Sequence, residues 1–152
     1  MYQKCIYKAN IYNIKEITLP SPETNFWKTV KKNLVGFKWV RLESWATKGV
    51  PDLMGFTETG DILTIELKVA KGNKVLLSPH QIAFHVEHQN SPCFILVKRA
   101  FDKAPRKSEV YLYTASQVRQ ISEQGLAVLP IYHSLSPIDW SGVRDALLAT
   151  LA

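Results

Sequence analysis

The sequence predicts an α/β domain in which helices flank a central mixed β-sheet. Runs of strand composition, rich in Val, Ile and Leu, alternate with segments whose apolar residues recur at helical spacing. The length of 152 residues is about that of one domain. With 46% hydrophobic and 21% charged residues, the composition is that of a globular protein rather than a disordered chain. We therefore expect residues 1–152 to form a single domain.

The first helix is expected over residues 22–34. Ser21 is a favourable N-cap, the proline after it suits the first helical position, and Gly36 can end the helix. The apolar residues of this segment stand at helical spacing from Glu23, which places that carboxylate on the buried stripe. Ahead of the helix, the alternation in residues 4–17 favours one or two exposed strands.

The rest of the chain alternates between strands and helices. Strands are expected over residues 37–44, 50–57, 61–70, 91–99 and 110–115, the first three as a meander. Further helices are expected over residues 78–90, 116–125 and 139–151. Ser78 and Gln81 form a capping box at the start of the second helix. Residues 101–109 are expected to be a mobile loop.

Positive charge is concentrated in the first third of the chain. Nineteen Lys and Arg against thirteen Asp and Glu give a net charge of +6. Residues 1–50 carry nine basic and three acidic side chains, whereas the later segments are balanced. A polyanion such as nucleic acid is the obvious partner for such a positive face. A basic surface that only keeps the protein soluble would have the same charge distribution.

Several classes of protein are disfavoured. No apolar run approaches the ~18 to 20 residues that span a bilayer, and the N-terminus lacks the pattern of a signal peptide. Cys5 and Cys93 lie far apart, without the spacing of a disulfide framework or a zinc site. We expect a soluble intracellular protein of the cytoplasm or nucleoid, without a membrane partner or a small-molecule cofactor.

Two carboxylates are expected to face each other across a β-hairpin. Within residues 61–70, alternation places Glu66 and Lys68 on one face of the strand. Asp52 and Glu66 are equally distant from residue 59, the middle of a turn, so a hairpin would set them opposite each other with Cβ atoms ~4.5 to 5.5 Å apart. Such a pair repels unless a proton or a cation lies between the two groups, and Mg²⁺ suits it. The alternative is an ordinary Glu–Lys pair on a solvated sheet face.

These residues resemble the signature of the PD-(D/E)xK nucleases. The run Gly49-Val50-Pro51-Asp52 followed by Glu66-Leu67-Lys68 carries the resemblance, which covers roughly residues 21–100. The surroundings are similar to archaeal-type Holliday-junction resolvases and VRR-NUC nucleases. The resemblance implies a restriction-endonuclease-like core and Mg²⁺-dependent cleavage of DNA, with Mn²⁺ as a substitute. Residues 101–152 lie outside it and are expected to complete the same domain.

The resemblance also implies the roles of particular residues. The implied catalytic residues are Glu23, Asp52, Glu66, Lys68 and Gln81. Asp52 and Glu66 would bind Mg²⁺ together with the backbone carbonyl of Leu67, and Glu23 would support that site. Lys68 would orient the attacking water or stabilise the transition state. Gln81 would be a supporting residue, unless it serves only as the capping partner of Ser78.

The leading interpretation is a structure-specific DNA endonuclease, a Holliday-junction resolvase that cuts branched DNA as a homodimer. The alternatives are a restriction-like or flap-type nuclease on the same scaffold, a catalytically silent DNA-binding module, and a structural protein with a chance motif. Resolvases often carry a small serine-rich loop at the place that residues 44–48 occupy in this chain, and the bulky Trp45 departs from that pattern. The residues expected to contact nucleic acid are Lys28, Lys31, Lys32, Arg41, Trp45, Lys48, Lys71 and Lys74.

Other residues carry weaker alternatives. Glu43 competes with Glu23 for the place of the third carboxylate. A zinc site is disfavoured because only two of the histidines at positions 80, 85 and 88 share a helix face, Glu87 notwithstanding. The aromatic residues expected in the core rather than on a base-stacking surface are Trp27, Trp39 and Tyr113.

Overall fold

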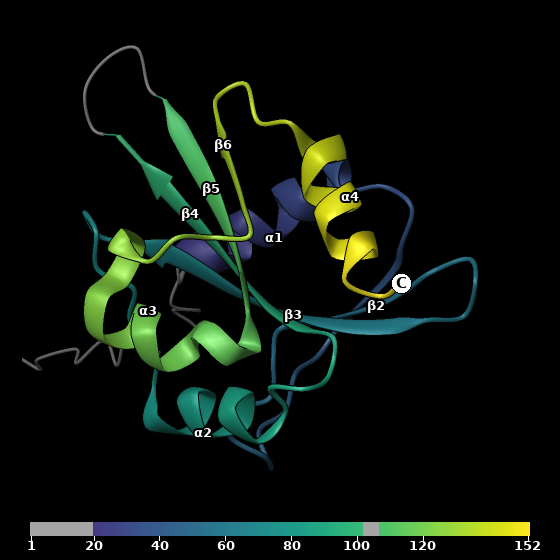
Figure 1. The fold of residues 1–152 in the computed structure, drawn as a ribbon, viewed down its shortest axis with the longest axis horizontal. Helices are drawn as coiled ribbons and strands as arrows, with labels where there is room; N and C mark the ends of the chain where they lie inside the picture. Colours follow the sequence, from purple (N-terminus) through teal and green to yellow (C-terminus); the bar gives the residue numbers. More distant parts are fainter. Residues whose placement is uncertain (1–19, 102–106) are drawn as a thin grey trace, which may run out of the picture.

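The computed structural model describes residues 20–101 and 107–152, which form a six-stranded sheet with helices on both faces (Figure 1). The helices are α1 (Pro22–Asn33), α2 (Pro79–Glu87), α3 (Val118–Gln124) and α4 (Trp140–Ala149). The strands are β1 (Lys38–Arg41), β2 (Leu53–Phe56), β3 (Ile62–Ala70), β4 (Cys93–Ala100), β5 (Ser108–Thr114) and β6 (Tyr132–Leu135). Short 3-10 turns at Ala115–Gln117 and Gly125–Ala127 flank α3.

The strands follow the order of the sequence, β1-β2-β3-β4-β5-β6. Neighbouring strands pair antiparallel except β3 and β4, which run parallel because α2 carries the chain back between them. The predicted α/β class, with a mixed sheet between helices, is therefore confirmed, and so is the antiparallel meander of its first three strands.

Two apolar clusters hold the layers together. On one face, Phe26 and Val30 of α1 and Val143 of α4 pack with the odd-numbered residues of β3. On the other face, α2 and α3 lie side by side and pack over β4 and β5, with Ile121 fully buried (Figure 1). The alternation predicted for β3 is therefore confirmed, and its even-numbered residues, Glu66 among them, face the side of α2.

The helix starts follow the local sequence signals. Ser21 caps α1 by accepting a hydrogen bond from the Thr24 backbone, and Ser78 caps α2 within a complete capping box. Gly125, with a φ of 60°, ends α3 where a Cβ would collide with the backbone of Asn73. These caps fix where each helix meets the sheet.

The structure departs from the sequence prediction at several boundaries. β1 and β2 are four residues each, shorter than the expected runs, and Ser108 of the expected loop already belongs to β5. The 3-10 turn at Ala115–Gln117 replaces Ser116 as the start of the third helical segment. The edge strand β6 was not predicted. The expected strands at 4–17 and the middle of the expected loop lie outside the described residues.

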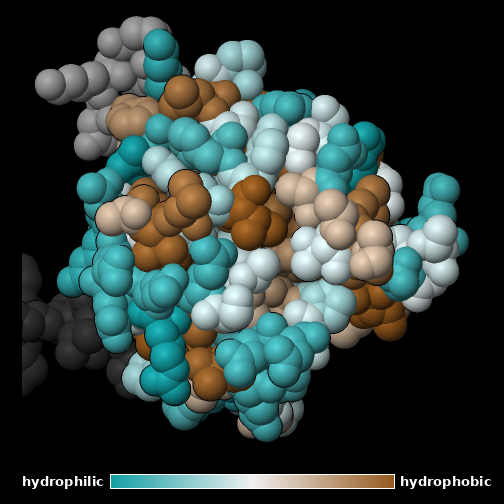
Figure 2. All heavy atoms as spheres, in the orientation of Figure 1, coloured by the Kyte–Doolittle hydropathy of each residue, from teal (hydrophilic) through white to brown (hydrophobic). Residues whose placement is uncertain are grey.

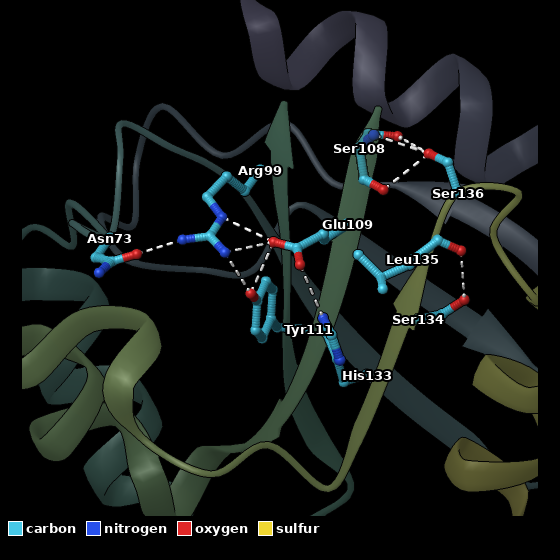
Figure 3. A network of polar contacts seen from close by, with 9 residues as sticks. All are labelled: Asn73, Arg99, Ser108, Glu109, Tyr111, His133, Ser134, Leu135 and Ser136. Carbon is cyan, nitrogen blue, oxygen red and sulfur yellow. Dashed lines mark hydrogen bonds and ion pairs between the residues drawn. The ribbon is translucent and has the colours of Figure 1, made fainter. Parts of the chain in front are cut away.

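A polar network joins the far ends of three strands (Figure 3). Arg99 of β4 donates to Glu109 of β5 and to the Tyr111 hydroxyl, and also to the Asn73 side chain in the turn after β3. His133 of β6 lies 3.4 Å from the other oxygen of Glu109. Arg99 and the Tyr111 hydroxyl both donate to Glu109, so we interpret the network as a clamp on β4, β5 and β6.

The surface seen in Figure 2 is mixed, with brown apolar patches separated by polar residues. This face therefore presents no continuous apolar area of the kind that obligate dimers bury. The expected homodimer stays a prediction. Among the described residues, no helix combines the length and apolarity required to traverse a bilayer.

Candidate active site

The β2–β3 hairpin sets Asp52 opposite Glu66. Leu53 pairs with Ile65 and Met54 with Thr64, so the same register, continued by one residue, aligns Asp52 with Glu66. The turn that fixes this register is closed by the Thr57 backbone donating to the Asp61 carbonyl. Directly opposed residues project from the same face of a sheet. Continued in this way, the register puts both carboxylates on one face of the hairpin, and the charge of Asp52 acts on Glu66.

Asp52 is anchored to both neighbouring strands. Its Oδ2 accepts a hydrogen bond of 2.8 Å from the Leu67 backbone, and its carbonyl accepts one of 2.7 Å from the backbone of Leu42. Asp52 is half-buried and stands just before β2 begins. The side chain therefore continues the hydrogen-bonding of β2 where its backbone pairing with β3 stops.

Glu66 is the most buried charged group of the site, with 1% of its surface exposed. Its Oε1 accepts from Gln81 Nε2 at 2.5 Å and lies 3.5 Å from Lys68 Nζ. Its Oε2 is buried and has no hydrogen-bond partner among the residues that the structure describes. A buried carboxylate oxygen without a partner is costly unless a proton or a cation serves it.

Burial and mutual repulsion perturb both acids. Burial, and then the charge of Asp52, raise the pKa of Glu66 to about 8. Burial also raises the pKa of Asp52, against the lowering effects of the Leu67 backbone and of Lys68. Raised pKa values on two neighbouring acids show that their carboxylates are unfavourable there, and a bound cation would offset this repulsion.

The backbone adds a further oxygen beside Asp52. The Thr64 N–H donates toward β4, to the carbonyl of Pro92, so the even-numbered residues of β3 bond on that side. Leu67 lies on the alternate side, where its N–H donates to Asp52. Because the N–H and C=O of a strand residue point to the same edge, the Leu67 carbonyl also points toward Asp52. The ligand role of this carbonyl stays a prediction.

Gln81 serves two purposes at once, contrary to the expectation that capping and site support exclude each other. Its Oε1 accepts from the Ser78 backbone at 3.0 Å, and its Nε2 donates to Glu66. The two ends of the amide are used separately, so the capping box aims the NH₂ group at the carboxylate. The prediction that the two roles compete for one amide was wrong.

Glu23 approaches the site without joining it closely. The residue is half-buried in the first turn of α1, and its charge contributes to the raised pKa of Asp52. Among the residues that the structure describes, no three His, Cys, Asp or Glu side chains form a metal-binding group. The supporting role of Glu23 stays a prediction. Its rival Glu43 lies beyond the end of β1, exposed and 3.8 Å from Arg41.

The loop before Asp52 is fixed against α2. Gly49 has a φ of 85°, and a Cβ at this position would stand 2.3 Å from the His80 carbonyl. A glycine is therefore required here for the loop to touch the first turn of α2. The contact places Asp52 and Gln81 on segments that support each other. From the sequence, Gly49 was recognised only as part of the motif, because its contact with His80 joins distant segments.

His80 and His85 belong to α2, and His88 follows the helix as its C-cap. His85 is fully buried, its Nδ1 lies 2.8 Å from the Gln81 carbonyl, and burial lowers its pKa. His88 stacks on Phe84, whereas His80 is exposed. His85 lies one turn after Gln81, at the i, i+4 spacing at which residues of a helix are neighbours.

The eight residues expected to contact nucleic acid are all exposed. They do not form one compact cluster. Lys31 and Lys32 lie in the last turn of α1, about 12 to 14 Å along the helix axis from Glu23. The backbones of Lys71 and Lys74 form an isolated antiparallel β-bridge in the turn after β3, about 10 Å beyond Lys68. Trp27, Trp39 and the buried Tyr113 pack against the core as expected.

Comparison with known proteins adds no assignment. No protein-family model matches the chain, and a search of curated proteins finds no match.

Proposed function

We propose that this protein is a Mg²⁺-dependent DNA endonuclease of the PD-(D/E)xK type that cuts branched DNA. The observation that carries the proposal is the pairing of Asp52 with Glu66 on one face of the hairpin, with Lys68 Nζ 3.5 Å from Glu66. A binding module has no need of converging carboxylates, which repel phosphate. Metal-dependent hydrolysis of a phosphodiester uses such a set, because a cation held by the carboxylates stabilises the charge that develops on phosphate as water attacks.

The oxygen atoms of the site fit a hard divalent cation. Mg²⁺ prefers oxygen ligands, and Asp52, Glu66 and the Leu67 carbonyl would supply them, with Glu23 as support. The buried Oε2 of Glu66 and the raised pKa values of both acids support this fit. When bound, Mg²⁺ would neutralise charge that develops on the phosphate.

The remaining residues prepare the site. Gln81 holds one oxygen of Glu66, so that the carboxylate keeps a single orientation. Lys68, whose side chain is 15% exposed, is accessible enough to donate to a phosphate oxygen. The exposed lysines of α1 and of the turn after β3 would contact the phosphates on either side of the cut.

The test is a cleavage assay with labelled four-way junction, flap and linear duplex DNA in Mg²⁺ or Mn²⁺. We expect cutting that EDTA stops and that Asp52→Asn, Glu66→Gln and Lys68→Met each reduce by at least ~100-fold. Glu58→Gln, which changes an exposed carboxylate in the β2–β3 turn, is the matched control and should cut normally.

The substrate panel separates the related activities. Preference for the junction supports a resolvase, and preference for the flap or the linear duplex supports the flap-type or restriction-like alternative. Binding of DNA without cutting in any divalent metal would indicate the catalytically silent module and contradict the enzyme proposal.

A further inference from the structure

Trp45 is the most exposed large apolar side chain in the described part of the chain, with 94% of its surface accessible. The other three tryptophans, Trp27, Trp39 and Trp140, pack against the core. Because Trp45 is almost fully exposed, its indole makes little packing contact with the domain. Both faces of the ring are therefore available to a ligand, and the surroundings of the residue indicate which kind.

The loop that carries Trp45 is tied to the candidate active site at both ends. At one end the Leu42 backbone donates to the Asp52 carbonyl, and at the other Gly49 packs on the His80 carbonyl. Within the loop, the Thr47 backbone donates to Ser44 Oγ at 2.9 Å. Trp45 is thus held seven residues from Asp52 on a loop with fixed ends, which limits the entropy lost when a ligand binds.

The surroundings of Trp45 fit a nucleobase better than a membrane or an apolar protein surface. Its neighbours Ser44, Ala46 and Thr47 are small or polar and offer no further apolar area. The exposed cations Arg41 and Lys48 flank the loop, and Glu43 offsets only one of them. A single flat aromatic ring between cations is the arrangement that stacks on a base while the cations contact phosphates.

We propose that Trp45 stacks on an unpaired nucleobase of the DNA whose backbone lies at Asp52 and Glu66. This inference rests on the proposed function and names its substrate class. In an intact duplex both faces of every internal base are covered, and opening a step costs free energy. The site therefore prefers DNA with an unpaired base beside the cut, as at a branch point, a flap or a gap.

Tryptophan fluorescence tests the stack without cleavage. In EDTA, we expect a short oligodeoxythymidylate to quench the wild-type emission, and an abasic oligonucleotide of equal length to quench it much less. Trp45→Phe keeps an aromatic face, so it should bind the thymidylate while losing the quenching signal. Equal quenching by the two oligonucleotides, or quenching that survives in Trp45→Phe, would overturn the proposal.

Affinity gives a second measurement. We expect Trp45→Ala to weaken thymidylate binding by roughly 5- to 150-fold, the loss typical of one base–aromatic stack, and to leave abasic binding nearly unchanged. Trp45→Phe should restore most of the loss. Lys48→Ala is the matched control and should weaken both ligands alike, since it removes only a phosphate contact. Equal affinity of Trp45→Ala and wild type for the thymidylate would refute the stack.

The two proposals fail in different ways. Stacking without Mg²⁺-dependent cutting would defeat the nuclease and leave the base-binding site standing. Cutting of intact duplex as fast as of flap or junction DNA, unchanged in Trp45→Ala, would defeat the stack and leave the nuclease. A Trp45 emission that shifts with anionic vesicles or with protein concentration, but not with DNA, would also overturn the stack.

Discussion

Replacing Glu66 by Gln should stabilise the metal-free protein while abolishing its activity. The unfolded chain releases the Glu66 proton near pH 4.5, whereas the folded protein keeps it until about pH 8. A raised acid pKa means that stability is fully present below the unfolded value and is lost as pH rises toward the folded value. In EDTA, the wild-type protein should therefore lose stability between pH 5 and pH 8.

The magnitude follows from the size of the shift. Each pH unit between the two pKa values costs ~1.4 kcal/mol, so at pH 7 the buried carboxyl lowers the free energy of unfolding by up to about 3 kcal/mol. Glutamine has the same shape and carries no charge beside Asp52. We expect Glu66→Gln to match the wild type near pH 4.5 and to exceed it by up to about 3 kcal/mol at pH 7.

Urea unfolding followed by circular dichroism measures this difference at each pH. Saturating Mg²⁺ at ~100 times its Kd should stabilise the wild type by ~2.7 kcal/mol and the Glu66→Gln variant much less. Glu58→Gln, in the exposed turn, should follow the wild type throughout. Parallel pH profiles of wild type and Glu66→Gln, or a wild type that gains stability from pH 5 to pH 8, would refute the reasoning.

Three further substitutions test the supports of the site and of the sheet. Gly49→Ala should lower the free energy of unfolding by ~2 to 4 kcal/mol in urea and reduce cleavage, because the new Cβ would collide with the His80 carbonyl at a positive φ. Unchanged stability would contradict the close contact. Gln81→Leu removes both the acceptor of the capping box and the donor to the Glu66 carboxylate. We expect it to lower the free energy of unfolding by ~2 to 3 kcal/mol in thermal or urea unfolding. A loss of only ~1 kcal/mol, the value of a helix cap alone, would contradict the role of Gln81 as donor to Glu66. Arg99→Ala leaves the buried Glu109 carboxylate without its main partner. We expect it to lower the free energy of unfolding by ~3 to 5 kcal/mol, while cleavage by the folded fraction stays normal. An unchanged free energy of unfolding would show that the network does not clamp the strands.

The hairpin and its carboxylates could be predicted because their signals are local. Alternation along β3 fixes which residues share a face, and the turn centred near residue 59 fixes the register between Asp52 and Glu66. Helix caps at Ser21 and Ser78 are equally local, since each depends on residues within one turn. These features agree with the structure because residues close in the sequence determine them.

Features that depend on distant pairing could not be predicted. β6 is four residues long, half-exposed and polar in part, and its pairing with β5 connects residues 20 to 26 positions apart. The network around Glu109 requires the register of three strands, which no single segment encodes. The second role of Gln81 depends on how α2 is placed over β3, because only that placement brings its amide to Glu66.

The most direct test of the central claim is a crystal of the protein soaked in Mn²⁺ and measured for anomalous scattering. The account predicts a peak within bonding distance of the carboxylates of Asp52 and Glu66, at ~2.0 to 2.2 Å, beside the Leu67 carbonyl. A saturating soak with no peak there, or with the two carboxylates turned away from each other, would contradict it.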